Sequence, residues 1–177
     1  LRTMGGHGAG RMAEPAEIVV AIEAALATKT GPLAGKKVLI TAGPTREAID
    51  PVRYISNHSS GKQGYAIAEA AIRLGAYVTL VSGPVNLPVP QGAGYFAVTS
   101  ADEMLKAVES ALPADIAIFT AAVADWKVAK AANEKIKKQD DGSMPSLAFA
   151  ENQDILKAIA TRKIGRPKLV VGFAAET

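Results

Sequence analysis

Lys36 to Glu47, which reads K-K-V-L-I-T-A-G-P-T-R-E, holds a short β-branched run followed by a turn of small residues. The run from Lys37 to Thr41 predicts a buried strand. Downstream, the alanine-rich stretch from Gly64 to Leu74 predicts a helix that ends at Gly75, and Tyr77 to Ser82 predicts a second strand. The fold therefore begins as strand, helix and strand, which is the order of a βαβ unit.

The same alternation continues along the chain. Further strands are predicted at Tyr95 to Thr99, Asp115 to Ala121 and Lys168 to Phe173. Further helices are predicted from a Ser100 cap to Leu112, with Glu103 as capping-box partner, and from Asn152 or Asp154 to Thr161. Strands separated by helices favour right-handed crossovers. We therefore predict an α/β, Rossmann-like fold with an open, mostly parallel sheet and helices on both faces.

Two segments lie outside this alternation. Residues 1–35 begin as a glycine-rich tail, continue as a helix that opens at Glu14 and Pro15, and end as a linker from Thr28 to Gly35. Lys127 to Ser146 is polar and rich in lysine, and contains the turn pair Asp141-Gly142. This second segment predicts a flexible lysine-rich flap.

Composition narrows the classes of function. The chain has 177 residues, 49% of them hydrophobic, which is enough for one medium-sized domain with a real core. A net charge of +3 is too small to indicate a nucleic-acid binder, and no apolar run is long enough to predict a membrane span. There is no cysteine and no signal-peptide pattern, so we expect a cytoplasmic protein. A start at Leu1 rather than Met suggests a piece of a longer protein.

The loop after the first strand carries a candidate phosphate site. Ligands of open parallel sheets bind beyond the carboxyl ends of the strands, and S-N-H-S-S-G-K-Q-G (Ser56 to Gly64) follows such an end. The hydroxyls of Ser59 and Ser60, close backbone approach at Gly61 and Gly64, and a helix N-terminus would suit a phosphate. The loop matches neither the P-loop nor the dinucleotide G-x-G-x-x-G motif, and on motif alone an ordinary glycine-rich turn is the commoner explanation.

A second candidate lies after the fourth predicted strand, which ends in T-A-A-V-A-D-W (Thr120 to Trp126). Small residues there leave room for a ligand against the backbone. Asp125 is compatible with two roles: a contact to a ribose or metal, or a solvated loop residue. Trp126 is compatible with simple core packing.

Other polar residues are ambiguous by themselves. Asn57 suits the orientation of a carbonyl, although turn formation is its commoner role. His7 and His58 are isolated and lack metal-ligand spacing, so the metal ligands stay unassigned. The run E-K-I-K-K (Glu134 to Lys138) could supply cations to a polyphosphate, although such runs are more often a solvated face.

The order of these motifs is more specific than any one of them. I-T-A-G-P-T-R-E, D-P-V-R-Y-I-S-N-H-S-S-G-K-Q-G, V-T-L-V-S-G-P, A-A-V-A-D-W, E-K-I-K-K and V-V-G-F-A-A-E-T together closely resemble phosphopantothenate-cysteine ligase of the bacterial bifunctional type. The similarity covers about Lys36 to Thr177. Gly10 to Pro15 (G-R-M-A-E-P) resembles the end of the flavin-dependent decarboxylase that precedes the ligase in such proteins.

The resemblance implies a division at residue 35. Residues 1–35 would be the tail of the preceding decarboxylase with a linker, and residues 36–177 a CTP-binding ligase domain that is incomplete at its C-terminus, because lysines that the family uses later have no counterpart. The decarboxylase cysteine also has no counterpart in this cysteine-free chain, so no flavin is expected. The family further implies a homodimer and dependence on CTP and Mg²⁺.

The resemblance also implies roles for individual residues. Asn57 and Ala122 would lie near the acyl group, Arg53 would help bind the acyl substrate or its intermediate, and Lys135 would act on the nucleotide. Contacts to CTP are implied for Phe119, Thr120, Ala121, Asp125, Lys135, Gln153, Asp154, Ile155, Leu156 and Phe173. Together with the glycine loop, this predicts one CTP cleft bounded by Ser59 to Gly64 and Thr120 to Asp125.

The implied reaction joins 4′-phosphopantothenate to L-cysteine through an acyl-cytidylate, with release of pyrophosphate and CMP. Two alternatives stay open. An NAD(P)-dependent reductase would share the sheet, but should show a dinucleotide glycine fingerprint and a Tyr-x-x-x-Lys pair, and no tyrosine here has a lysine four residues later. A non-catalytic nucleotide-binding or dimerisation module is the other alternative.

Overall fold

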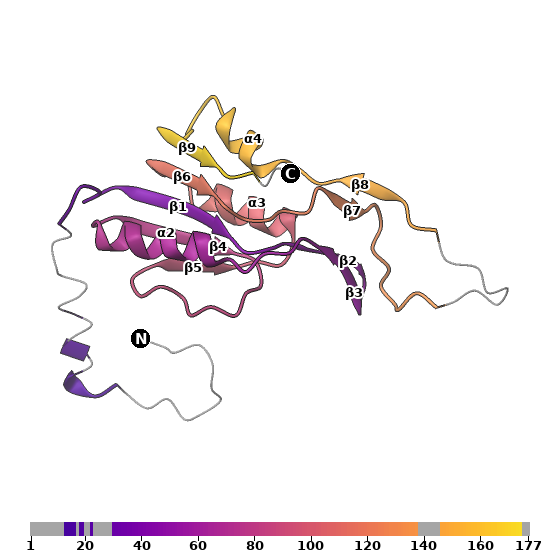
Figure 1. Ribbon diagram of the computed structural model, residues 1–177, viewed down its shortest axis with the longest axis horizontal. Helices are drawn as coiled ribbons and strands as arrows, with labels where there is room; N and C mark the ends of the chain where they lie inside the picture. Colours follow the sequence, from indigo (N-terminus) through magenta and orange to yellow (C-terminus); the bar gives the residue numbers. More distant parts are fainter. Residues whose placement is uncertain (1–12, 17, 20–21, 23–29, 138–145, 175–177) are drawn as a thin grey trace.

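The computed structural model describes residues 13–16, 18, 19, 22, 30–137 and 146–174. Its centre is a five-stranded sheet with the order β5-β4-β1-β6-β9 (Figure 1). All neighbouring strands in it are parallel. The strands are β1 (Lys37–Ala42), β4 (Tyr77–Ser82), β5 (Gly94–Ala97), β6 (Ile116–Phe119) and β9 (Leu169–Gly172). The predicted Rossmann-like α/β class is confirmed.

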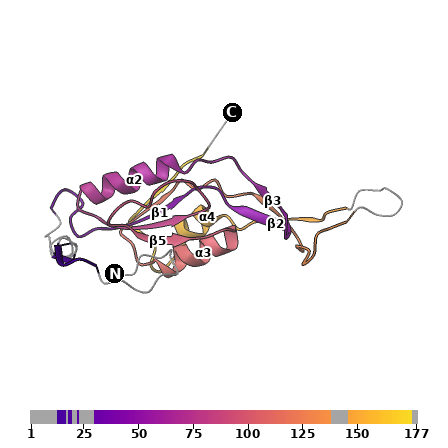
Figure 2. The same ribbon diagram turned by 90° about the horizontal axis from the view of Figure 1, so that it is seen from below.

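Three helices cover the two faces of this sheet. Figure 2 shows α2 (Lys62–Arg73) on one face, and α3 (Ala101–Ser110) and α4 (Ile155–Ala160) on the other. The alternation of strand side chains divides the core accordingly. One cluster joins Val38, Ile40 and Ala42 of β1 to Tyr65, Ala68 and Ala71 of α2. The other joins Leu39 of β1 to Met104 and Val108 of α3 and to Ile155 and Ile159 of α4.

The start of α3 follows the capping chemistry that the sequence predicts. The Ser100 hydroxyl accepts a hydrogen bond from the backbone N–H of Glu103 at 3.2 Å, and the Glu103 carboxylate accepts one from the backbone N–H of Ser100 at 3.4 Å. This confirms the capping box. The helix ends at Ser110 rather than at the predicted Leu112, because Pro113 disfavours helical backbone at the residue before it.

Two antiparallel strand pairs extend from the carboxyl edge of the sheet as an arm (Figure 1). One is the hairpin of β2 (Arg46–Asp50) and β3 (Arg53–Ser56), and the other pairs β7 (Trp126–Val128) with β8 (Phe149–Glu151). The sequence did not predict the hairpin. The prediction of one irregular flap from Lys127 is wrong at its start, since Lys127 and Val128 belong to β7. Asp141 and Gly142 lie outside the described residues.

The N-terminal segment is described only in part. Pro15, Ala16, Ile18, Val19 and Ile22 are helical, and the remaining residues of the predicted helix lie outside the described set. The division of the chain at residue 35 stays a prediction. Across the described residues, no helix combines the length and apolar character needed to cross a bilayer.

Candidate functional site

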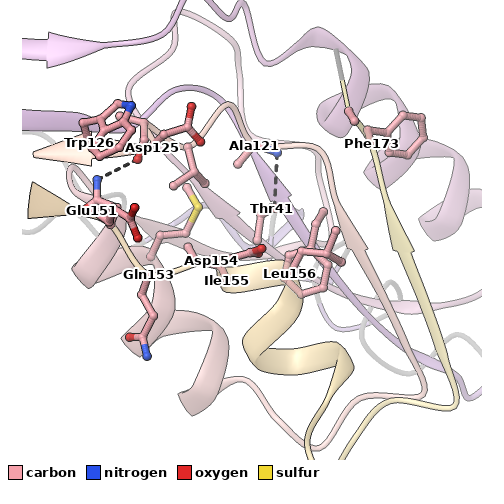
Figure 3. A pocket seen from close by; sticks show the side chains of 16 residues that line it. Thr41, Ala121, Asp125, Trp126, Glu151, Gln153, Asp154, Ile155, Leu156 and Phe173 are labelled. Carbon is pink, nitrogen blue, oxygen red and sulfur yellow. Dashed lines mark hydrogen bonds between the residues drawn. The ribbon is translucent and has the colours of Figure 1, made fainter. Parts of the chain in front are cut away.

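A cavity of about 490 Å³ lies beyond the carboxyl ends of β1 and β6 (Figure 3). These two strands lie side by side at the point where the chain changes direction within the sheet, which is where ligands of open α/β folds bind. Its walls include most of the residues for which the resemblance implies a CTP contact. These are Phe119, Ala121, Asp125, Gln153, Asp154, Ile155, Leu156 and Phe173.

Thr120 differs from its two neighbours because of strand alternation. Phe119 and Ala121 line the cavity on the side of α3 and α4, whereas Thr120 does not. The Thr120 hydroxyl instead donates to the backbone carbonyl of Thr41 at 2.7 Å, and lies close to Gly64 on the side of α2. The Thr120 side chain therefore does not face this cavity, and its implied contact with CTP stays a prediction.

The cavity wall combines apolar and polar side chains. Ile155 and Phe119 are buried at its base, while Leu156 and Phe173 are partly exposed. Trp126 also lines it with 53% of its surface exposed, so the alternative in which Trp126 serves core packing is wrong. Apolar side chains beside a few polar groups are the usual surroundings of an aromatic ligand such as a nucleotide base.

Asn152 is a cavity residue that the sequence did not single out as a ligand. Its Nδ2 donates to the carbonyl of Ala124 at 2.8 Å, and its backbone N–H donates to the carbonyl of Asp125 at 2.8 Å. The first bond fixes the amide orientation, since a flipped amide would place Oδ1 against the carbonyl oxygen of Ala124. The Asn152 Oδ1 atom is buried and has no hydrogen-bond partner among the described residues. A ligand that donates a hydrogen bond would satisfy it.

Asp154 has a structural task in the same segment. Its carboxylate accepts a hydrogen bond from the backbone N–H of Lys157 at 2.9 Å, which makes it the N-cap of α4. This decides between Asn152 and Asp154 as the first residue of the predicted helix. One carboxylate oxygen of Asp154 is therefore already occupied.

The glycine loop borders a second cavity, also of about 490 Å³, on the side of α2. Ser59, Ser60, Lys62 and Arg46 line it, together with residues 84–87. The single cleft predicted from Ser59 to Gly64 and Thr120 to Asp125 is thus two cavities. A ligand that touched both would have to cross the ends of β1 and β6.

The two glycines of this loop serve the backbone in different ways. Gly61 has a φ of 72° at the N-cap of α2, a conformation that favours glycine. Gly64 is buried, and a Cβ there would lie 2.5 Å from the Thr120 hydroxyl and 2.6 Å from the Ala42 Cβ. Gly64 therefore lets α2 pack closely on the sheet, which is a sufficient reason for glycine without a phosphate.

Asn57 and Ala122 lie together between the two cavities. The Asn57 Nδ2 donates to the carbonyl of Val123 at 2.9 Å, and Val123 lines the first cavity. Ala122 is held next to it, with its N–H donating to Gly43 at 2.9 Å and its carbonyl accepting from Thr45 at 3.2 Å. The pair for which the resemblance implies an acyl-group role therefore shares one location.

Arg53 and Lys135 line neither cavity. The Arg53 guanidinium contacts the Asp50 carboxylate, with Nε 2.9 Å from Oδ2, and its Nη2 donates to the carbonyl of Ile136 at 3.0 Å. Lys135 is exposed. The roles implied for Arg53 and Lys135 stay predictions, because neither residue contacts one of the two cavities.

The hydrogen bonds of Asp50 predict that the stability of the fold decreases at acid pH. Its pKa is held well below the ordinary range, chiefly by the side-chain hydrogen bond from Arg53 and further by the backbone N–H groups of Val52 and Ile136. A carboxyl with a lowered pKa stabilises the fold above its unfolded pKa, about 3.9 for Asp, and loses that effect as the pH falls. Urea unfolding at stepped pH should therefore show stability falling from about pH 5 to pH 2, and a shallower fall in Asp50→Asn. Equal slopes in both proteins would contradict this.

The donor set bears on the expected Mg²⁺. Within the described ranges, no three His, Cys, Asp or Glu side chains are grouped so as to hold a metal ion. Mg²⁺ at nucleotide sites is usually held by phosphates, water and one or two carboxylates. Asp125 is an exposed carboxylate at the cavity, so the residues present fit an ion that is carried mainly by the nucleotide.

Comparisons with known proteins cover nearly the whole chain. The chain is 52% identical over 174 residues to the Coenzyme A biosynthesis bifunctional protein CoaBC of Vibrio vulnificus (strain YJ016), which covers 98% of this chain and 43% of the relative. It is 50% identical over 175 residues to the protein of that name from Escherichia coli (strain K12), again with 98% and 43% coverage. The chain therefore spans less than half the length of these relatives.

Solved structures agree with the fold. A crystal structure of the C-terminal domain of Coenzyme A biosynthesis bifunctional protein CoaBC superposes with a TM-score of 0.69 at 46% identity, and covers 81% of this chain and 66% of that chain. The DNA/pantothenate metabolism flavoprotein from Streptococcus pneumoniae gives 0.65 at 23% identity, with 76% and 68% coverage, which supports the fold alone. The family described as the DNA/pantothenate metabolism flavoprotein C-terminal domain matches residues 33–177. The expected family resemblance is confirmed, and the chain belongs to this family.

Proposed function

We propose that this chain carries the nucleotide site of a ligase in coenzyme A biosynthesis, which uses CTP to join 4′-phosphopantothenate to L-cysteine. The observation that carries the proposal is the gathering of Phe119, Ala121, Asp125, residues 153–156 and Phe173 around one cavity. These residues come from three separate parts of the chain. Their position at the crossover of a Rossmann-like sheet is the place where nucleotides bind.

The first half-reaction activates the carboxylate. The 4′-phosphopantothenate carboxylate attacks the α-phosphorus of CTP, the bond to the β-phosphate oxygen breaks, and pyrophosphate leaves with its electron pair. The product is an acyl-cytidylate. Lys135 supplies positive charge where negative charge accumulates on the phosphates. Asp125 would be the protein carboxylate that holds Mg²⁺, which would neutralise phosphate charge in the same way.

The second half-reaction forms the amide. The amine of L-cysteine attacks the acyl carbonyl, an amine proton is lost to solvent, and CMP leaves with the electrons of the broken acyl–oxygen bond. Asn57 orients the acyl carbonyl, since its side chain lies beside Ala122 and Val123 at the edge of the nucleotide cavity. Holding the carbonyl against the amine is a contribution of proximity and orientation.

A homodimer is part of the same proposal. The arm exposes large apolar side chains that a partner could cover, among them Val52, Tyr54, Trp126 and Phe149, each more than half exposed. Apolar patches of this kind often mark protein interfaces.

The unpartnered side-chain oxygen of Asn152 predicts which nucleotide bases the cavity accepts. Cytosine presents an exocyclic amine, a donor that fits the unpartnered Oδ1 of Asn152, whereas uracil presents a carbonyl there. We expect UTP to bind about tenfold more weakly than CTP, since a buried acceptor left without a donor costs roughly 1–3 kcal/mol. Asn152→Ala should reduce this preference, and Asn86→Ala, in the second cavity, should leave it unchanged.

Titration of the full-length protein with CTP, UTP and ATP, each with Mg²⁺, provides the measurement. Backbone amide signals of residues 119–121, 125 and 153–156 should move with CTP. An intact fold in which CTP moved none of these signals would refute the nucleotide site. Equal affinities for CTP and UTP would refute the role of Asn152 alone. ATP tests whether the cavity accepts a purine that also carries an exocyclic amine.

A further inference from the structure

Asp50 is a fully buried carboxylate at the turn of the β2–β3 hairpin, outside both cavities. Its Oδ1 accepts the backbone N–H groups of Val52 and Arg53, both at 2.9 Å. Its Oδ2 accepts the Arg53 side chain and also the backbone N–H of Ile136 at 3.1 Å. Every one of these partners is a donor, so a carboxylate is the group that satisfies them all.

Arg53 completes a clamp on the same residue, Ile136. Its Nη2 donates to the carbonyl of Ile136 at 3.0 Å, while Asp50 accepts the N–H of that residue. A third bond, from the N–H of Ala132 to the carbonyl of Ile49 at 2.9 Å, ties the preceding turn to the hairpin. The clamp therefore binds both polar groups of the Ile136 backbone.

These bonds hold the backbone at Ile136 but do not involve the side chains of Lys135 and Lys137. Lys135 and Lys137 are exposed and line neither cavity, so their reach depends on where the backbone between them is fixed. A long lysine side chain on an unanchored segment would lose conformational freedom each time it met a phosphate. A backbone that is already fixed at Ile136 removes part of this loss of conformational entropy.

We propose that Asp50 and Arg53 are positioning residues that anchor the Ile136 backbone to the hairpin and so present Lys135 to the phosphates of the nucleotide. The role of Lys135 rests on the proposed function. The anchor itself rests on the hydrogen bonds above and can be tested separately.

Limited trypsin digestion of the folded full-length protein tests the anchor. The bond between Lys135 and Ile136 carries the N–H that Asp50 holds, so it should be cut slowly in the wild type. Asp50→Asn keeps the side-chain size but turns one oxygen into a donor that faces other donors. We expect cleavage there to become about tenfold faster, because one held peptide group is released. Cleavage after Lys163, in an exposed loop, should not change.

Glu47→Gln is the matched control on the same hairpin. Glu47 is also a buried carboxylate, but it accepts the backbone N–H of Ala101 at 2.9 Å and has no bond to residues 132–137. It should alter thermal stability without accelerating cleavage after Lys135. If Asp50→Asn left that cleavage rate unchanged, or if Glu47→Gln raised it as much, the anchor would be refuted, whatever the protein catalyses.

A double-mutant cycle tests whether Asp50 acts through Lys135. Pyrophosphate release from CTP should fall about tenfold in Asp50→Asn, with the CTP affinity of the first cavity little changed. In a Lys135→Gln background, Asp50→Asn should cause almost no further loss. The same tenfold loss in both backgrounds would overturn the positioning role. A wild-type protein that released no pyrophosphate would refute the proposed function, while the digestion result would still decide the anchor.

Discussion

Lys135→Gln in the full-length protein is expected to slow pyrophosphate release from CTP by a factor of roughly a hundred, since loss of one cation aimed at developing charge costs on the order of 3 kcal/mol. The reason is that negative charge on the phosphates grows as the carboxylate attacks. Glutamine keeps much of the length of the side chain and removes only its charge. No acyl-cytidylate should accumulate, because the defect precedes its formation.

Asn57→Asp is expected to fail at the later step. Acyl-cytidylate should form and then persist, because a carboxylate beside the acyl carbonyl disfavours the oxyanion that amine attack creates. The structure adds a second reason for this defect. The Asn57 Nδ2 donates to the carbonyl of Val123, and an aspartate would oppose that oxygen with another acceptor. The side chain would turn away from the position in which it orients the acyl group.

Quenched-flow experiments with labelled CTP would count pyrophosphate and acyl-cytidylate in one time course. Lys137→Gln is the matched control for charge, since Lys137 is also an exposed lysine of the same run. It should leave pyrophosphate release within about threefold of the wild type. Equal loss of pyrophosphate release in Lys135→Gln and Asn57→Asp, with no intermediate in either, would reject the division of labour.

The parallel sheet was predictable because each of its strands is specified locally. Lys37 to Ala42 and Tyr77 to Ser82 are β-branched runs, and both are buried almost throughout, as runs without polar alternation should be. The Ser100 and Glu103 pair likewise specified a helix start through contacts within three residues. Local chemistry of this kind can be read from sequence without knowing the partners.

The arm was not predictable for the opposite reason. Charged residues occur in both strands of the hairpin, Arg46–Asp50 and Arg53–Ser56, and such residues are expected to be exposed to solvent. Asp50 is nevertheless fully buried. Its burial depends on Ile136, which lies 86 residues later along the chain. A buried carboxylate is tolerated only when its partners are present, and sequence alone does not name partners at such separation.

The candidate site was predictable by similarity but not by geometry. Resemblance named the residues around the cavity, whereas the different orientation of Thr120, whose hydroxyl bonds to Thr41 and does not line the cavity, became visible only in the structure. Asn152 was missed because its significance is an unpartnered oxygen, and an unpartnered atom has no signature in sequence. At Gly64 the sequence could not separate two explanations, since close packing of α2 is by itself a sufficient reason for the glycine that suggested a phosphate loop.

Gly64→Ala should lower the free energy of unfolding by roughly 3 kcal/mol, because overpacking a tight contact forces neighbouring groups to shift. The added Cβ would meet the Thr120 hydroxyl at 2.5 Å and the Ala42 Cβ at 2.6 Å. Neither neighbour can move easily. Ala42 is fixed in the buried strand β1, and the Thr120 hydroxyl is held by the carbonyl of Thr41 at 2.7 Å. The helix α2 would have to move away from the sheet and expose the cluster that it covers.

Alanine substitutions at two other glycines provide the comparison for this prediction, with the free energy of unfolding of each variant measured in urea. Gly61→Ala should cost about 1–2 kcal/mol, because alanine is strained at a φ of 72°. Gly94→Ala should change stability by no more than about 0.5 kcal/mol, since the nearest atoms to its Cβ are at ordinary contact distances of 3.7 and 3.9 Å. The expected order of destabilisation is therefore Gly64, then Gly61, then Gly94. A Gly64→Ala protein with unchanged stability and weakened CTP binding would show instead that this glycine serves close approach of the phosphate, and would return it to the nucleotide site.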